Sequence, residues 1–149
     1  MSPKSLLRHP RCVSAIDELS TGNTFKPVIV DETTASKVKH VIMCSGKVYY
    51  DLLQKKEDDK RDDVLLVRIE QLYPFPEKEI MAIFSQYKNA QFRWVQEEPL
   101  NMGAWDYLLR YLRQSPIDVV ARKASASPAT GFKKSHDAQQ QDILDRAFS

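Results

Sequence analysis

The feature that most constrains the fold of this chain is a regular alternation of short apolar runs with amphipathic patterns of helical spacing. Four runs rich in apolar residues lie at 38–44, 64–69, 91–95 and 117–121, and the first of them is almost continuously apolar toward its end. Such runs are typical of strands that are buried on both faces, as they are in a parallel sheet. The segments between them carry apolar residues at three- and four-residue spacing, which indicates helices. The alternation therefore predicts an open α/β sheet with helices on both faces.

The first part of the chain does not share this rhythm. Its opening residues are polar, and a short helix is predicted at 13–19. We therefore expect residues 1–24 to form an arm and short helix that lead in from a missing upstream domain, and residues 25–149 to form the α/β domain. Residues 25–30 predict a fifth strand, which Pro27 places at an edge of the sheet.

Length and charge exclude several classes of protein. The 149 residues suffice for one domain, and 22 Lys and Arg against 20 Asp and Glu give a net charge of +2. A nucleic-acid-binding protein usually shows a clustered basic excess, so we expect no nucleic-acid partner. No apolar run approaches the roughly 20 residues of a membrane span, so we expect no membrane partner. Two cysteines do not make a disulfide framework and favour a reducing compartment.

Local motifs for cofactors and metals are absent from the sequence. Its four glycines never occur in a GxG spacing, which excludes a dinucleotide fingerprint and a Walker loop. The three histidines lie far apart and no HExxH or CxxC occurs, so the spacing predicts no metal site. Cys44 would need a nearby base to act as a nucleophile, and burial in the core is the better interpretation.

Polar residues follow each apolar run, and parallel strands would place them at one edge of the sheet, where open α/β folds bind ligands. These tetrads are residues 44–47, 70–73, 96–99 and 122–125. In the first of them, Ser45 and Lys47 at the start of a helix fit a phosphate or a carboxylate. The alternative is that the glycine between them only makes the turn and that Lys47 is solvated.

Glu97, Glu98 and Glu70 belong to the same set of strand-end residues. They are candidates for a general acid and base, since like charges push the pKa values of paired carboxylates apart. Adjacent residues on an extended segment point to opposite sides, however, so Glu97 and Glu98 would not converge on one atom. Salt bridges or a subunit contact are the better interpretation. A stand-alone small enzyme that uses these carboxylates is one alternative function.

Five motifs of the chain resemble, in order and in spacing, the C-terminus of the thiamine-diphosphate-dependent 2-oxoglutarate dehydrogenase component. They are SPKSLLRHP, VIMCSGKVYYDL, VRIEQLYPFP, VQEEPLNMGAW and ASASPATG. The resemblance covers nearly the whole chain and is weakest at residues 20–36. It implies the C-terminal domain of a transketolase-like enzyme: a three-layer α/β fold with a mostly parallel five-stranded sheet that contains one antiparallel strand.

The resemblance also implies a division of labour within a longer polypeptide. The family's full enzyme oxidatively decarboxylates 2-oxoglutarate and succinylates a lipoyl group, with thiamine diphosphate and Mg²⁺ held between two earlier domains. The motif for that cofactor and the family's catalytic histidines are absent from this sequence. We therefore expect no catalytic residue, no bound cofactor and no metal in this chain, and no turnover by the chain alone.

Assembly and effector binding are the roles that the resemblance leaves to this domain. It implies contacts with the upstream domains and with the homodimer mate, and an effector such as acetyl-CoA or AMP. The residues expected to receive a phosphate of the effector are Arg8, Ser45, Lys47, Gln96 and Arg122. A module that docks the lipoyl-bearing acyltransferase component is the other alternative function. The resemblance places the protein in the bacterial cytoplasm or, in a eukaryote, in the mitochondrial matrix.

Overall fold

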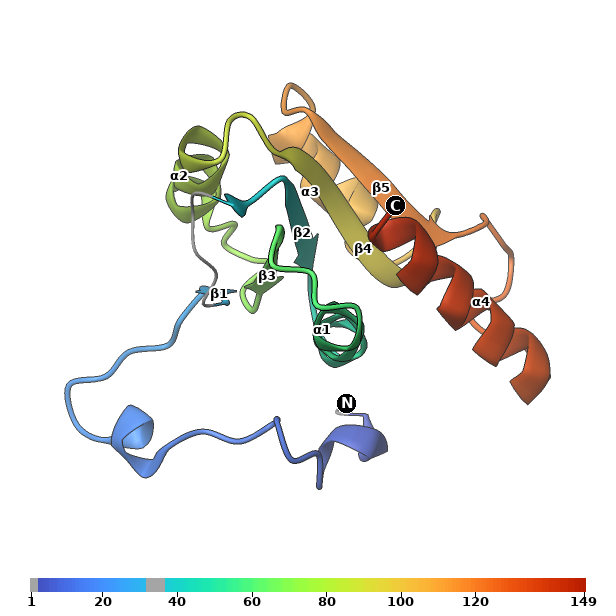
Figure 1. Cartoon of the computed structure of the whole chain (residues 1–149), viewed down its shortest axis with the longest axis horizontal. Coiled ribbons are helices and arrows are strands. Elements are labelled where there is room, and N and C mark those ends of the chain that lie inside the picture. Colours follow the sequence, from blue (N-terminus) through green and yellow to red (C-terminus); the bar gives the residue numbers. More distant parts are fainter. Residues whose placement is uncertain (1–2, 32–36) are drawn as a thin grey trace.

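A computed structural model describes residues 3–31 and 37–149 and contains a five-stranded sheet in the order β1-β3-β2-β4-β5 (Figure 1). Strand β1 is antiparallel to β3, and the other neighbouring strands are parallel. The predicted fold class, a mostly parallel five-stranded sheet with one antiparallel strand, is confirmed. The strands span Val28–Val30 (β1), His40–Cys44 (β2), Val64–Ile69 (β3), Gln91–Pro99 (β4) and Ile117–Arg122 (β5).

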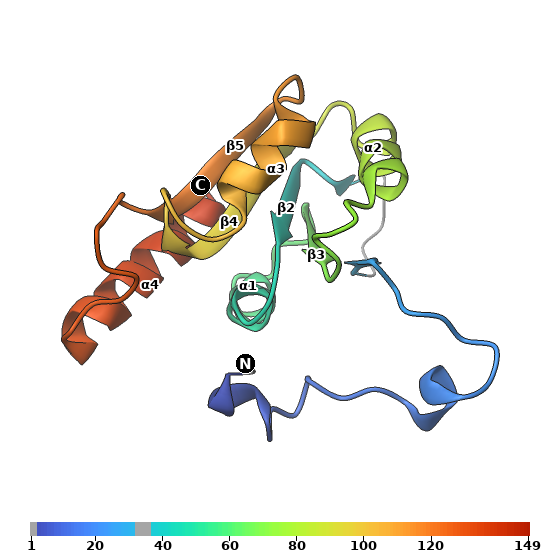
Figure 2. The same ribbon diagram turned by 180° about the vertical axis from the view of Figure 1, so that it is seen from behind.

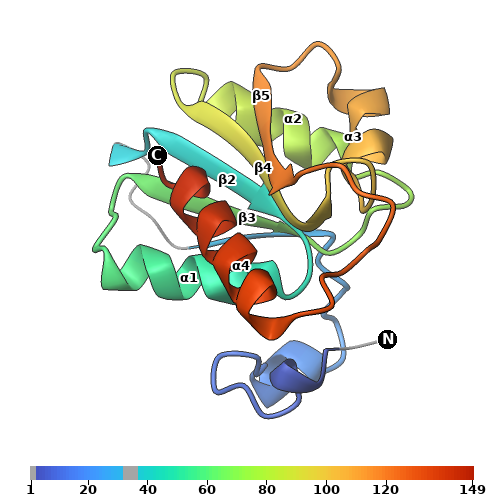
Figure 3. The same cartoon turned by 90° about the vertical axis from the view of Figure 1, so that its right-hand side faces the viewer.

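Two pairs of helices cover the two faces of the sheet and complete the three layers (Figure 3). Helices α1 and α4 pack on one face, and helices α2 and α3 pack on the other. Two short 3-10 helices, η1 and η2, precede the sheet. The helices span Lys4–Leu6 (η1), Ile16–Leu19 (η2), Val48–Asp58 (α1), Glu77–Gln86 (α2), Trp105–Leu112 (α3) and Lys133–Ala147 (α4).

The central strand β2 explains the nearly continuous apolar runs of the sequence. Val41 and Met43 face the core under α2 and α3, whereas Ile42 and Cys44 face the core under α1 and α4, and all four are 0% exposed. Side chains alternate between the two faces of a strand, so burial on both faces requires an apolar residue at each position. The full burial of Cys44 confirms it as a core residue, and burial also raises the pKa of its thiol.

The chain before β1 forms an arm that lies outside the three layers (Figures 1 and 2). The first part of the arm lies against helix α1. The ring of His9 is 4.9 Å from the ring of Tyr50, and Arg11 forms an ion pair with Glu57. The helix predicted at 13–19 is shortened to η2. The boundary between this arm and the α/β domain stays a prediction.

Strand β4 is longer than the sequence predicts. A loop is expected at 96–99, but β4 continues to Pro99, which pairs with Arg122 of β5 after a register shift that follows Val95. Such a shift lets a strand take up extra residues without losing its partner. The loop prediction was wrong because charged residues suggest a loop, whereas here pairing with β5 continues the strand to Pro99 and Glu98 alone is exposed between buried Gln96 and Pro99.

Helix α1 likewise continues into the charged segment at 55–63 and ends at Asp58. Its residue Lys55 binds Asp59 at 3.0 Å and Asp145 of α4 at 3.1 Å, so part of the segment links two helices on the same face. The loop predicted at 31–37 lies mostly outside the described residues. Within the described part of the chain, no helix is long and apolar enough to cross a membrane.

Packing of α4 on the sheet gives a first test of this fold. Ile143 of α4 is 0% exposed, whereas Leu19 in the arm is exposed. We predict that Ile143→Ala lowers the free energy of unfolding by about 2–5 kcal/mol, because it removes buried methylene groups and leaves a cavity. Leu19→Ala is the control and should change that free energy by less than about 0.5 kcal/mol. Urea denaturation measures both, and equal small effects would contradict the packing of α4.

Candidate functional site

The carboxyl ends of β2 and β4 form the topological switch point of the sheet. The chain leaves β2 through α1 toward β3, and it leaves neighbouring β4 through α3 toward β5, on the opposite side. Open α/β sheets bind ligands in the crevice that such diverging connections create. Here Lys47, which follows β2, reaches into that place and binds Glu97 of β4 at 3.1 Å and Asp51 of α1 at 2.7 Å.

The charge of Lys47 is therefore balanced within the chain. Burial alone lowers the pKa of its ammonium group, but the hydrogen bonds and charges of Asp51 and Glu97 outweigh this effect and leave the pKa above its usual value. The sequence predicts that the turn at 45–47 binds a phosphate or a carboxylate ligand. In the structure, the ammonium group of Lys47 contacts two carboxylates of the protein itself, those of Asp51 and Glu97. Ser45 lies half-buried at the start of the same turn.

The same network extends across α4 to the end of β5. The amide nitrogen of Gln140 donates to Asp51 at 3.0 Å, and the amide oxygen of Gln140 accepts a hydrogen bond of 3.2 Å from Arg122 Nη2. Arg122 Nη2 also lies 3.2 Å from Nδ1 of His136. Two residues of the predicted effector site, Lys47 and Arg122, are thus connected through Asp51 and Gln140. The partners of Lys47 are carboxylates, whereas those of Arg122 are an imidazole and an amide.

Gln96, a third predicted residue, lies on the opposite face of the sheet and is only 3% exposed. Its amide oxygen accepts hydrogen bonds from the Trp94 ring at 2.9 Å and from the backbone of Trp105 at 3.2 Å, and its amide nitrogen donates to the Met102 carbonyl at 2.7 Å. Gly103 has a φ of +72°, and a Cβ there would lie 3.1 Å from the Gln96 amide. Gln96 therefore ties the end of β4 to the start of α3.

The last predicted effector residue, Arg8, is exposed in the arm, next to η1. The structure therefore places Lys47 and Arg122 in one network, with Ser45 beside Lys47, and it places Gln96 and Arg8 elsewhere. The effector site as a set of five residues stays a prediction.

The three strand-end carboxylates take separate positions. Glu70 binds Arg68 at 2.7 Å, Glu97 binds Lys47, and Glu98 is exposed. The ion pairs of Glu70 and Glu97 agree with the interpretation of these two carboxylates as salt-bridge partners. Among residues 3–31 and 37–149, no group of three or more His, Cys, Asp or Glu side chains is placed to hold a metal ion.

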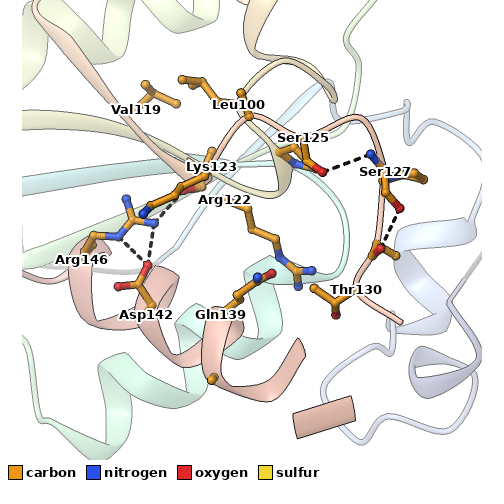
Figure 4. Close-up of a pocket in the computed structure, with 16 residues that line it drawn as sticks. Leu100, Val119, Arg122, Lys123, Ser125, Ser127, Thr130, Gln139, Asp142 and Arg146 are labelled. Carbon is orange, nitrogen blue, oxygen red and sulfur yellow. Dashed lines mark hydrogen bonds and ion pairs between the residues drawn. The ribbon is translucent and has the colours of Figure 1, made fainter. Parts of the chain in front are cut away.

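A cavity of about 860 Å³ lies between β5, the loop at 123–130 and helix α4 (Figure 4). Its walls are formed by Pro99, Leu100 and Val119 on the sheet side, by the loop, and by the outer face of α4. The cavity could not be predicted from the sequence. The loop at 123–130 consists mostly of small residues, and α4 forms one wall of the cavity. The one signal within the sequence is Arg122, which the strand-end tetrads already include.

Comparison with known proteins assigns the chain to a family. Residues 13–148 match the family model described as "2-oxoglutarate dehydrogenase C-terminal". The chain belongs to this family. The resemblance found in the sequence motifs is thereby confirmed over nearly the whole chain.

Relatives of the chain are much longer proteins. The 2-oxoglutarate dehydrogenase E1 component of Cupriavidus necator is 45% identical and that of Haemophilus influenzae is 46% identical, each over 100% of this chain. The matched region is 16% of the first protein and 17% of the second. The chain thus spans about a sixth of the length of these relatives and corresponds to their C-terminal part.

A solved structure shares the fold at low sequence identity. The protein described as "Split gene transketolase, inactive beta4 tetramer" superposes with a TM-score of 0.60 and 15% identity, over 87% of this chain and 43% of that one. At this identity the likeness concerns the fold alone. It confirms the transketolase-like architecture that the resemblance implies.

Replacement of Lys47 tests the network at the switch point. We predict that Lys47→Met lowers the free energy of unfolding by about 1–2 kcal/mol, because Asp51 and Glu97 then face each other without a cation. Lys133→Met is the control, since Lys133 forms its ion pair with Asp137 on the exposed surface and should contribute less than about 0.5 kcal/mol. Guanidinium denaturation is unsuitable because its salt screens charges, so urea is used. Equal losses in both variants would contradict a structural role of Lys47.

Proposed function

We propose that this chain acts as the C-terminal domain of an E1-type 2-oxoglutarate dehydrogenase and that it serves assembly, not chemistry. The full enzyme would oxidatively decarboxylate 2-oxoglutarate and transfer the succinyl group to a lipoyl arm. The observation that carries the proposal is the match of the whole chain to the C-terminal sixth of E1 components. The ion pairs of Glu70 and Glu97 support it, because they commit both carboxylates to partners within the chain.

Thiamine diphosphate and Mg²⁺ would be supplied by the rest of the longer enzyme. The described residues of this chain do not fit the metal, since they contain no cluster of carboxylates or histidines that could hold it. We therefore derive no catalytic step through the cofactor for this domain. Its own contribution would be to hold neighbouring domains in position.

Exposed apolar side chains support the assembly role. In the arm, Leu7, Ile16 and Leu19 are largely exposed, and we propose that they contact the upstream domains. An arm that buries so little of its own apolar surface gains its stability from a partner surface.

A second exposed surface is the aromatic cluster of Tyr73, Phe75, Tyr107 and Tyr111 beside α3. The rings of Phe75 and Tyr111 stack at 4.5 Å, and Tyr73 is 82% exposed. The hydrogen bond with Tyr111, with smaller contributions from burial and from the charges of Tyr111 and Tyr73, raises the pKa of Tyr107 to about 12. Tyrosine is favoured in interfaces because it combines an apolar ring with a hydroxyl. We propose the homodimer mate as the partner of this cluster.

Two further roles belong to the same proposal. The lipoyl-bearing acyltransferase component would meet the assembled enzyme and not this domain alone. An effector such as acetyl-CoA or AMP would bind at the carboxyl edge of the sheet, for which Arg8, Ser45, Lys47, Gln96 and Arg122 are the expected residues. Of these, Arg122 has the strongest claim to a ligand anion, because it is buried and hydrogen-bonded to neutral groups only.

A chimaera tests the proposed function directly. The Cupriavidus necator E1 component without its C-terminal region should be inactive, and fusion of this chain in place of that region should restore 2-oxoglutarate-dependent reduction of ferricyanide. We expect restoration because the two sequences are 45% identical over this region. Turnover by the isolated 149-residue chain, or a folded chimaera without activity, would contradict the proposal.

Self-association tests the aromatic cluster. We predict that the isolated chain forms dimers as its concentration rises and that Tyr73→Lys weakens them without unfolding the domain, because Tyr73 is exposed. Sedimentation velocity measures the change. Phe132→Lys alters another exposed aromatic residue, at the start of α4, and should leave association unchanged. A chain that stays monomeric at high concentration would contradict the role of the cluster.

A further inference from the structure

The C-terminal end of α4 is held by two arginines that belong to other elements. Arg93 of β4 donates a hydrogen bond of 3.0 Å to the carbonyl of Ala147. Arg61, which precedes β3, donates one of 2.8 Å to the carbonyl of Phe148. The last carbonyls of a helix have no partner within it, and cations near them also balance the negative end of its dipole. The two arginines therefore fasten the last turn of α4 to the sheet.

The ring of Phe148 strengthens this attachment. It is buried in the core under α1 and α4, at the end of a helix that runs back across the sheet (Figure 3). The guanidinium group of Arg61 lies 5.8 Å from the centre of the ring, and the ammonium group of Lys55 lies 5.9 Å from it, so both cations face an aromatic surface. The other charged groups at this end of α4 are engaged in ion pairs, Asp145 with Lys55 and Arg146 with Asp142.

His40 lies on the face of the sheet that α4 covers. It is the first residue of β2, which runs between β3 and β4. Alternate residues of a strand share a face, so His40 shares the face of Ile42, which packs under α1 and α4. By the same alternation, Arg93 shares the face of Val95 in that core. The imidazole and the guanidinium group that holds Ala147 therefore lie on the same side of neighbouring strands.

Asp63 connects His40 to the other arginine. Its Oδ1 accepts a hydrogen bond of 2.7 Å from Nε of Arg61, and its Oδ2 accepts one of 3.1 Å from Nη2 of the same group. The Oδ2 atom lies 3.8 Å from Nε2 of His40, a longer contact than either of these. The charged groups that act on His40 are thus Asp63 and Arg61 before β3, Arg93 of β4 and Lys39 on its own segment. Three of these four groups are cations.

A proton on His40 does not fit this arrangement. Its Nδ1 atom is buried without a hydrogen-bond partner in the described part of the chain. A neutral imidazole can leave one nitrogen as an acceptor, whereas an imidazolium has two donors, and the one at Nδ1 would be buried without an acceptor. Burial, followed by the charge of Arg93, holds the pKa of His40 below its usual value, although the charge of Asp63 acts in the opposite direction.

We propose that His40 is an acid-sensitive latch for α4: its protonation releases the last turn of the helix from the two arginines while the sheet stays folded. Release lets Arg61 and Arg93 move away from the imidazolium and lets water reach its buried nitrogen. The last turn opens before the strands do, because helix ends open at a lower free energy than a core sheet. The latch is a property of this chain and does not rest on the proposed function.

Hydrogen exchange of the 149-residue chain as a function of pH tests the latch. The closed form is favoured while His40 is neutral, so it loses its advantage as the pH falls through the ordinary pKa of about 6.5 that a released imidazole has. Uptake of one proton between about pH 7.5 and about pH 5.5 enriches the open form by at most about tenfold. The protection factors of the amides at 144–147 should therefore fall about three- to tenfold over this range, with β2 and β3 unchanged.

Variants assign the pH dependence to one histidine. His40→Gln should hold the last turn equally well at both pH values, because its amide takes up no proton. His9→Gln and His136→Gln are the matched controls, since each removes one of the other two histidines of the chain. Both controls should lose protection at 144–147 to the same extent as the wild-type chain. His136→Gln also separates the latch from the contact of His136 with Arg122 nearer the start of α4.

The imidazole signals of the wild-type chain keep the test independent of variants that fail to fold. Titration of His40 by NMR should give a pKa below the ordinary value of about 6.5. A titration at or above that value would overturn the proposal. So would equal protection of the last turn at both pH values, the same loss in folded His40→Gln, or a loss that β2 and β3 share.

Discussion

Burial of the sheet on both faces is the constraint on which the rest of this structure depends. Because α1 and α4 cover one face and α2 and α3 the other, β2 and β3 are apolar along almost their whole length. Parallel strands between two such layers bring four carboxyl ends to one edge, and this edge is where polar side chains can meet. The positions of Lys47, Gln96 and Arg122 therefore follow from the packing of β2, β4 and β5, which are neighbours in the sheet but lie far apart in the sequence.

The edge holds cations in two different ways. Lys47 forms ion pairs with Asp51 and Glu97, so its charge helps to join α1 to β4. Arg122 is buried to a greater degree and yet bonds to the neutral side chains of His136 and Gln140. The two cations at this edge thus differ in the kind of group that binds them, carboxylates for Lys47 and neutral side chains for Arg122.

The elements of the fold follow from the sequence wherever burial alone determines them. The run at 64–69 predicts β3 to the residue, because all its positions except Arg68 are apolar and buried. The end of β4 does not follow, since its register shift depends on pairing with β5. The isolation of Arg122 could not be predicted either, because it depends on His136 and Gln140, which only the docking of α4 brings near. Motif resemblance identified the family because it does not depend on such contacts.

The central claim is that the arm and the aromatic cluster are surfaces of a larger enzyme. Hydrogen exchange compared between the isolated chain and the active chimaera tests it most directly, since amides that become buried in an assembly exchange more slowly. The account predicts slower exchange in the chimaera at residues 3–27, at residues 73–75 and in α3, with the central strands unchanged. Equal exchange of these segments in both proteins, or slowing confined to α1 and α4, would contradict it.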